Sequence, residues 1–217
     1  MRSVPQESER PMGSPTTDGV DEKNGPAGWT LMLPPGWWHV PLDERRGQSV
    51  TALLDNRLAS LPRDRVAALR RELEAELIRL VERAVAHDAV EMYLNVDLIH
   101  GLPVAASCLV TVVPTGRATA LPAAELAGMM GDQPDDEVGV LEVAGAPAAR
   151  VRRREPVDEA DGFSTGDLPV TRLQVYVPVP NTTEMLLLSF STPMDPIADA
   201  MVTLFDAIAE SLCWRHT

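Results

Sequence analysis

Hydrophobic residues recur along this chain with two spacings, and each spacing predicts a different kind of element. Over residues 43–59 and 63–86 they return every three or four positions, with charged residues between them, which indicates two amphipathic helices. Asp43 is the expected N-cap of the first helix. A short helix is predicted over 122–130. A closing helix is predicted over 197–212, because its apolar residues form a single stripe.

Other segments alternate apolar and polar residues or form short apolar runs, which is typical of β-strands. The predicted strands are 29–33, 90–98, 104–113, 138–144, 148–155, 170–179 and 185–191. The second and third flank His100-Gly101-Leu102-Pro103, so we expect them to form a hairpin or to be neighbouring antiparallel strands. The last run is apolar on both faces and is therefore expected at the centre of the sheet.

Hairpins with helices grouped around them predict an α+β fold: a largely antiparallel β-sheet flanked by helices, in an α/β/α sandwich. The closing helix has two possible N-terminal caps. Thr192 and Asp195 have the spacing of a capping box, and Asp195 before Pro196 offers the alternative. Residues 1–28 are rich in Pro, Gly, Ser and acidic residues and hold little that could be buried. They predict a disordered tail in front of a single domain, residues 29–217.

Three parts of the sequence resemble a known group of folds. They are the start WTLMLPPGWW, which contains Pro35-Gly36-Trp37, the hairpin-rich middle, and the closing helix with Phe205-Asp206-Ala207-Ile208. Over residues 29–214 they resemble the Mog1/PsbP-like α/β/α sandwich, in particular its small actinobacterial, LpqN-like members. The resemblance implies an accessory or binding protein that docks onto a partner protein or a larger assembly, and neither motif is catalytic.

The chain carries 32 acidic and 19 basic residues, for a net charge of -13. Phosphate backbones and anionic lipid surfaces attract basic proteins, so this balance argues against nucleic acid and anionic membranes as partners. It suits a basic protein partner, or it has no role beyond solubility. No apolar stretch is long enough to span a bilayer, so no membrane insertion is expected.

Cysteine content and the N-terminal sequence bear on the compartment. The two cysteines, Cys108 and Cys213, lie far apart in sequence, and we expect both to be small buried side chains with free thiols. The first residues contain no apolar segment of the kind found in secretion signals. These features predict a cytoplasmic protein.

Residue patterns that support catalysis or metal binding are missing from the sequence. His39, His87, His100 and His216 are scattered and lack paired cysteines, so no metal site is predicted. His87 follows the second helix, where a cation suits the helix dipole. The GxSxG, GxGxxG and P-loop patterns do not occur. The sequence therefore predicts no enzyme, no catalytic residue and no cofactor, while a catalytic triad assembled from distant residues stays open.

Two adjacent tryptophans, Trp37 and Trp38, are the first candidates for partner binding. They follow a Pro-Gly turn, and exposed tryptophan is enriched where proteins bind one another. The alternative is that both plug one end of the sandwich. Because adjacent side chains diverge on any regular element, at most one of them is expected to be fully in the core.

The second candidates are four arginines in one predicted strand: Arg150, Arg152, Arg153 and Arg154. A strand turns Arg152 and Arg154 to one face and Arg153 to the other. These cations would meet an acidic partner or a phosphate group. The alternative is internal pairing with two acidic loops, 132–137 and 155–161.

Taken together, these patterns favour a non-catalytic binding or accessory protein, an adaptor or a chaperone-like protein, that works through protein–protein contacts. Two alternatives stay open at this point. One is a small-ligand carrier or sensor with a pocket between sheet and helices. The other is a hydrolase whose active site has no recognisable sequence pattern.

Overall fold

The computed structural model describes residues 25–44, 46–58, 63–95, 98–99, 102–103, 105–114, 121–155 and 169–216. Of the predicted tail, 1–28, only the last four residues fall within these ranges. His100 and residues 156–161 of the second acidic loop lie outside them, so the predictions made for those positions do as well.

Most helices and strands lie close to the predicted segments, whereas the strands at residues 37–41, 102–103 and 213–215 were not predicted. The helices are α1 (Arg46–Leu58), α2 (Arg63–Ala86), α3 (Ala123–Met130) and α4 (Ala198–Glu210), and a 3-10 turn, η4 (Asp195–Ile197), leads into α4. The strands are β1 (Gly28–Thr30), β2 (Trp37–Pro41), β3 (Ala89–Asn95), β4 (Leu98–Ile99), β5 (Leu102–Pro103), β6 (Ala106–Pro114), β7 (Glu137–Val143), β8 (Ala146–Glu155), β9 (Val170–Pro178), β10 (Glu184–Thr192) and β11 (Cys213–Arg215).

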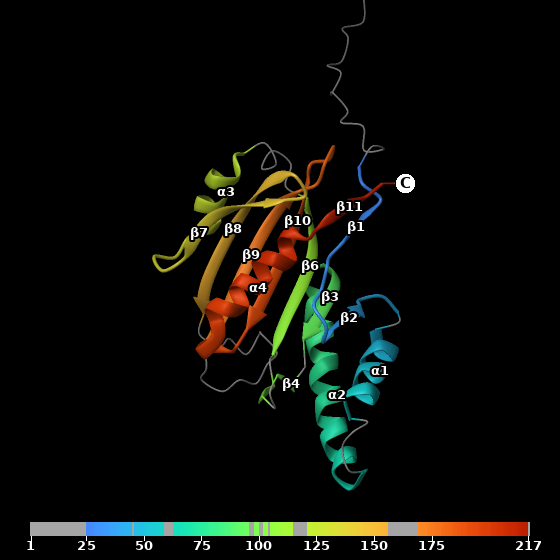
Figure 1. The fold of residues 1–217 in the computed structure, drawn as a ribbon. Coiled ribbons are helices and arrows are strands. Elements are labelled where there is room, and N and C mark those ends of the chain that lie inside the picture. The colour runs from blue at the N-terminus through green and yellow to red at the C-terminus, as the bar shows by residue number, and fades with distance from the viewer. Residues whose placement is uncertain are drawn as a thin grey trace, which may run out of the picture.

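Seven of these strands form one sheet, in the order β2-β3-β6-β10-β9-β8-β7, and every neighbouring pair is antiparallel (Figure 1). The remaining strands form two separate two-stranded ribbons, β1-β11 and β4-β5. The predicted α+β class, with a largely antiparallel sheet flanked by helices, is therefore confirmed. The apolar run that was expected at the centre is β10, which pairs with β6 on one side and β9 on the other.

One face of the sheet is covered by α4, and the largest core lies beneath it (Figure 1). The rings of Phe190 on β10 and Phe205 on α4 stack with centroids 5.0 Å apart, and both side chains are fully buried. The β1-β11 ribbon contributes to the same face, because Trp29 and Trp214 pack against this core. Burial of these large aromatic side chains contributes strongly to stability here.

Among the described residues, helices cover the opposite face at its two ends. The α1–α2 pair packs on β2 and β3, where Leu53, Leu54 and Met92 are buried together. At the other end α3 packs on β7 and β8, over Ala149 and Val151. The central strands between these helices form the floor of a groove.

The closing helix begins differently from either cap predicted for it. The Thr192 hydroxyl accepts a hydrogen bond from the Met194 amide at 3.2 Å and donates one to the Ala105 carbonyl at 2.8 Å. Asp195 lies inside η4, and neither η4 nor α4 has a side-chain cap hydrogen bond. Both capping predictions were therefore wrong, because the hydroxyl stabilises a turn that ends β10 while the carboxylate forms an ion pair.

The prediction for the second cysteine was also wrong. Cys213 is exposed and lies in β11, beyond the end of α4. The apolar stripe of the helix stops at Leu212, after which the chain turns to pair with β1. Cys108 is buried in β6, as expected.

Candidate functional site

The two tryptophans begin β2, and their side chains lie on opposite faces of the sheet. Trp37 lies on the α4 face, where its ring meets that of Phe205 edge-on with centroids 6.4 Å apart. Trp38 packs against the core beneath α1 and α2. Both side chains are half-buried, so each fills the margin of a different core. A partner contact at either one stays a prediction.

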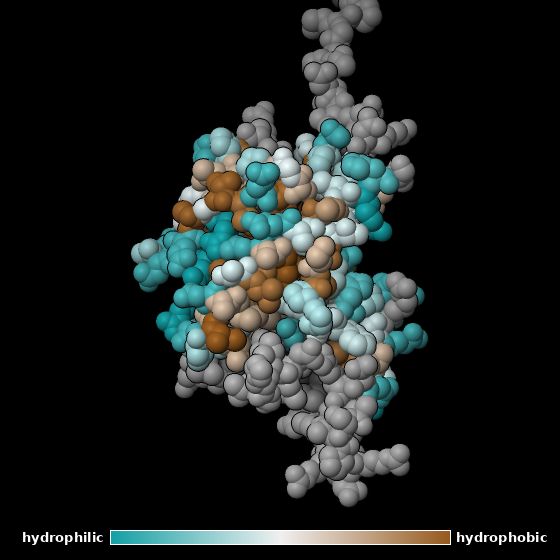
Figure 2. Space-filling view, viewed as in Figure 1, coloured by the Kyte–Doolittle hydropathy of each residue, from teal (hydrophilic) through white to brown (hydrophobic). Residues whose placement is uncertain are grey.

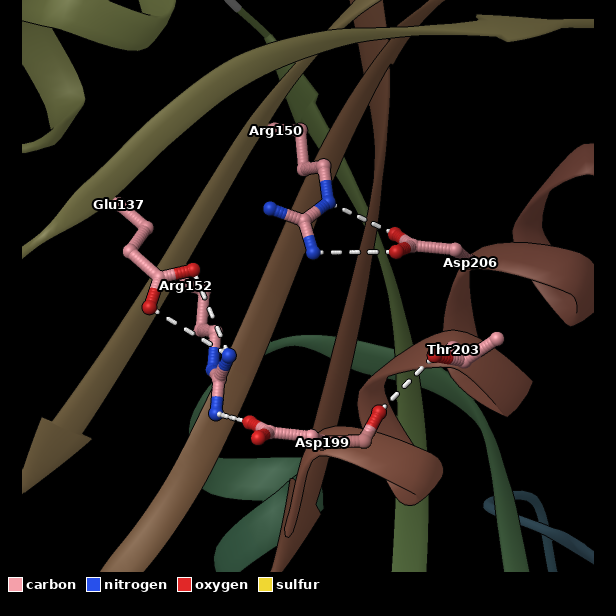
Figure 3. A network of polar contacts seen from close by, with 6 residues as sticks. All are labelled: Glu137, Arg150, Arg152, Asp199, Thr203 and Asp206. Carbon is pink, nitrogen blue, oxygen red and sulfur yellow. Dashed lines mark hydrogen bonds and ion pairs between the residues drawn. The ribbon is translucent and has the colours of Figure 1, made fainter.

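Arg150 and Arg152 point from β8 toward α4 and join that helix to the sheet (Figure 3). Arg150 grips Asp206 with two hydrogen bonds, Nε to Oδ1 at 2.8 Å and Nη2 to Oδ2 at 3.0 Å, and both side chains are largely buried. Arg152 contacts Asp199 at 2.5 Å and Glu137 at 3.4 Å, at a more exposed position. The bidentate pair is the stronger contact because it is both oriented and shielded from water.

Arg153 points to the other face, and Arg154 back to the α4 side, as the strand alternation predicts. Arg153 donates to the Met130 carbonyl at 2.8 Å, and it pairs with the buried carboxylate of Asp136 at 3.1 Å. Arg154 pairs with Asp195 at 2.8 Å. The hydrogen bond to Met130 fastens the C-terminal end of α3 to the sheet.

Each of the four arginines thus has a carboxylate within ion-pair distance. Arg152 and Arg153 pair partly with the acidic loops, as the alternative prediction had it. Arg150 and Arg154 instead pair with carboxylates of α4 and η4, which the sequence analysis missed. The positive charge of the cluster is therefore largely matched within the chain, and its role as a partner contact remains a prediction.

A second polar cluster fastens the N-terminal strand to the sheet. The Glu91 carboxylate accepts hydrogen bonds from the Trp29 indole nitrogen at 3.1 Å and from the Tyr93 hydroxyl at 2.6 Å. Burial and the hydrogen bond to the carboxylate raise the pKa of Tyr93 above its ordinary value of 10.0. His39 lies against the same ring, with centroids 5.0 Å apart. These contacts explain the position of β1 and indicate no reactive group.

Cys108 is fully buried beside this cluster. Burial, followed by the nearby Glu91 carboxylate, raises the pKa of its thiol above the ordinary value of 9.0. Because the thiolate is the reactive form, we expect a thiol reagent to modify the native protein at the exposed Cys213 and not at Cys108. Absorbance titration with Ellman's reagent, before and after adding denaturant, measures this difference.

The burial of Cys108 also makes the stability of the fold decrease at alkaline pH. A folded-state pKa above the unfolded value stabilises the fold at pH values below 9.0, and this contribution is lost as the pH rises further. Urea unfolding should therefore show a falling free energy of unfolding above pH 9.0, with Tyr93 adding to the decline above 10.0. The decline should be shallower in Cys108→Ala. An equal decline in that variant would contradict the assignment to Cys108.

The groove on the face opposite α4 has a volume of about 650 Å³. Its floor includes Leu109 and Leu187, and the hydroxyl groups of Ser107 and Ser191 lie 2.7 Å apart at one end. His87, at the end of α2, contributes to its wall. The groove is within the usual size of small-ligand sites and combines apolar and polar lining.

The outer edge of the sheet near α3 exposes large apolar side chains. Met129 and Met130 end α3, and Val138 and Val140 lie on β7, with exposed fractions of 63, 37, 49 and 49 % respectively. We call these four residues the α3–β7 rim. Val138 and Val140 pair across from Val151 and Ala149, so they lie on the α3 side of the sheet. Figure 2 shows hydrophobic side chains where α3 and β7 meet.

The described part of the chain contains neither a metal-ligand cluster nor a membrane-spanning helix. It holds no group of three or more His, Cys, Asp or Glu side chains arranged to hold a metal ion. No helix within the described ranges is long and apolar enough to cross a bilayer.

The fold defines an α+β protein built on a seven-stranded antiparallel sheet. No family model matches the chain, and no curated protein matches it. The function must therefore be argued from the surface of this molecule.

Proposed function

We propose that this chain is a non-catalytic accessory protein that acts by binding another protein. The observation that carries the proposal is the α3–β7 rim, where four large apolar side chains remain exposed along one edge of the sheet. Apolar side chains gathered at an open edge are costly to leave in water and prone to uncontrolled association, and they mark surfaces that a partner covers.

The state of the nucleophilic groups supports the non-catalytic part of the proposal. The Cys108 thiol is buried, and its raised pKa keeps it neutral. The Ser107 hydroxyl is hydrogen-bonded to that of Ser191, and among the described residues neither has an imidazole as its hydrogen-bond partner. A nucleophile needs a base within hydrogen-bond reach, and these groups lack that arrangement.

The resemblance to the Mog1/PsbP-like group supports the same proposal, because its members act as accessory or binding proteins. The large antiparallel sheet flanked by helices agrees with that resemblance. We also propose a cytoplasmic location, since Cys108 and Cys213 are both free thiols.

Replacing the two rim valines by threonine tests the proposal while keeping the β-branched shape that strands favour. Affinity purification from native lysate should recover a stoichiometric partner with the wild type and much less of it with Val138→Thr/Val140→Thr. Val90→Thr is the matched control, because Val90 is similarly exposed, at 44 %, on β3. Failure of the wild type to recover a partner, or full recovery with the double variant, would contradict the proposal.

The groove favours a second candidate, a carrier of a small ligand. Its volume and mixed lining suit a ligand with an apolar body and a hydrogen-bonding end. A thermal-shift screen of lipids and metabolites separates the two candidates, since a ligand in the groove raises the melting temperature of the wild type and of the rim variant equally.

A further inference from the structure

We propose that β7 receives a strand from the partner: an extended segment with alternating apolar and basic residues pairs with the outer edge of β7. This inference rests on the proposed function and names the chemistry of its partner. Strand addition of this kind takes its affinity from main-chain hydrogen bonds and its specificity from alternate side chains.

The edge itself supports strand addition. β7 is the last strand of the seven-stranded sheet, and within the described ranges it pairs only with β8. It runs for seven residues, Glu137–Val143, and contains no proline. The opposite edge strand, β2, is shorter and ends in Pro41, which cannot donate to a ladder. Of the two edges, β7 is the better template for another strand.

The side chains along β7 give the added strand an apolar neighbour on one face. Val138 and Val140 lie two residues apart on the α3 side, and Met129 and Met130 end the helix that packs there. A strand laid beside β7 projects alternate residues to this side. Those residues are therefore expected to be apolar, and the residues between them are free to be charged.

Charge decides which kind of segment fits. From residue 121 to 149 the chain contains six acidic residues and no Lys, Arg or His. Three of the acids, Asp132, Asp136 and Glu137, pair with Arg152 or Arg153 of β8, whereas Glu125, Asp135 and Glu142 have no ion pair among the described residues. Asp135 and Glu142 stand exposed near the two ends of β7. A basic segment complements this edge. A second copy of the chain does not, because it would bring an equally acidic edge on a molecule of net charge -13.

A fluorescein-labelled heptapeptide of alternating lysine and valine, KVKVKVK, is the probe. Fluorescence anisotropy should show binding to the wild type, weaker binding of the acidic counterpart EVEVEVE, and loss of binding when alternate backbone nitrogens of the basic peptide are methylated. Methylation removes ladder donors and leaves the side chains in place, so it isolates the main-chain contribution. Amide exchange of β7 should slow on peptide addition.

Three variants locate the site. Val138→Thr/Val140→Thr should weaken binding of the basic peptide by about tenfold, the loss expected for one to two buried methyl groups. Glu142 lies on the same face of β7 as the two valines and therefore faces no peptide lysine directly. Glu142→Lys should still weaken binding by about threefold, because it replaces an attractive charge at the edge by a repulsive one. Val90→Thr should leave the affinity unchanged.

Each contrary outcome overturns a defined part of the proposal. Equal binding of the methylated peptide overturns strand pairing, and equal binding of the acidic peptide overturns the charge requirement. A wild-type dimer in sedimentation that the double valine variant dissociates would make the occupant a second copy. If the peptide fails to bind while the double valine variant still loses a partner in affinity purification, strand addition is wrong and the proposed function stands.

Discussion

Replacing Phe205 by alanine is expected to lower the free energy of unfolding by about 3–5 kcal/mol, the largest single effect in this molecule. Phe205 is fully buried at the centre of the main core, stacked on Phe190 at 5.0 Å and met edge-on by Trp37 at 6.4 Å. Its removal leaves a cavity bordered by the rings of Phe190 and Trp37. Urea unfolding followed by tryptophan fluorescence measures the loss, and Trp37 reports directly on the altered site.

The neighbouring Leu204 provides the matched control on the same helix. It is only half-buried at the margin of the core, so Leu204→Ala should cost clearly less. A Phe205→Ala variant that is no less stable than Leu204→Ala would show that α4 does not hold the core together as described.

Asp206→Ala is expected to have the second largest effect, lowering the free energy of unfolding by about 2–3 kcal/mol. The change leaves the Arg150 guanidinium beneath α4 without its bidentate partner, and that side chain is only 17 % exposed. An uncompensated charge in such a site costs far more than an exposed ion pair is worth.

Asp199→Ala is the control for this second prediction. Asp199 also meets an arginine of β8, but its side chain is 90 % exposed, so its loss should stay within about 1 kcal/mol. Thermal or urea unfolding of both variants gives the comparison. Equal losses would mean that the burial of the Arg150–Asp206 pair contributes nothing extra.

Helices and strands with strong periodicity were predicted well from the sequence. The bounds of α2 match the predicted segment at both ends, and the central position of β10 followed from its continuous apolar run. The first strand was predicted to reach residue 33, but β1 ends at Thr30. The chain beyond it bonds elsewhere, since the Met32 amide donates to the Ser211 hydroxyl at 2.9 Å. A side-chain partner from the far end of the chain leaves no signal in local periodicity.

The ion pairs of the four arginines were only partly predictable from the sequence. Asp199 and Asp206 are seven residues apart, which places them on one face of the closing helix, and Asp195 lies in η4 just before that helix. This spacing is a signal in the sequence for carboxylates that could pair with cations, although the sequence analysis missed it. The match of these carboxylates to alternate arginines of β8 depends on how α4 crosses the sheet, which only the tertiary fold determines.

The α3–β7 rim was not predicted, for a different reason, and a pocket between sheet and helices was raised only as an alternative without a position. The alternation of Val138 and Val140 in β7 reads as an ordinary strand with one buried face. The valines remain exposed because β7 is the last strand of the sheet and α3 covers it only in part. Strand order and the extent of helix cover are properties of the assembled sheet, so no single segment encodes them.

The pairing of β1 with β11 brings the two extremities of the described chain to one place. Gly28 lies opposite Arg215 in that ribbon, and Figure 1 shows it on the side of the molecule away from β7. A tether or reporter attached at residue 25 or 216 therefore leaves from a common exit point, remote from the open strand edge. The molecule can be immobilised or labelled there without obstructing the surface that we propose a partner covers.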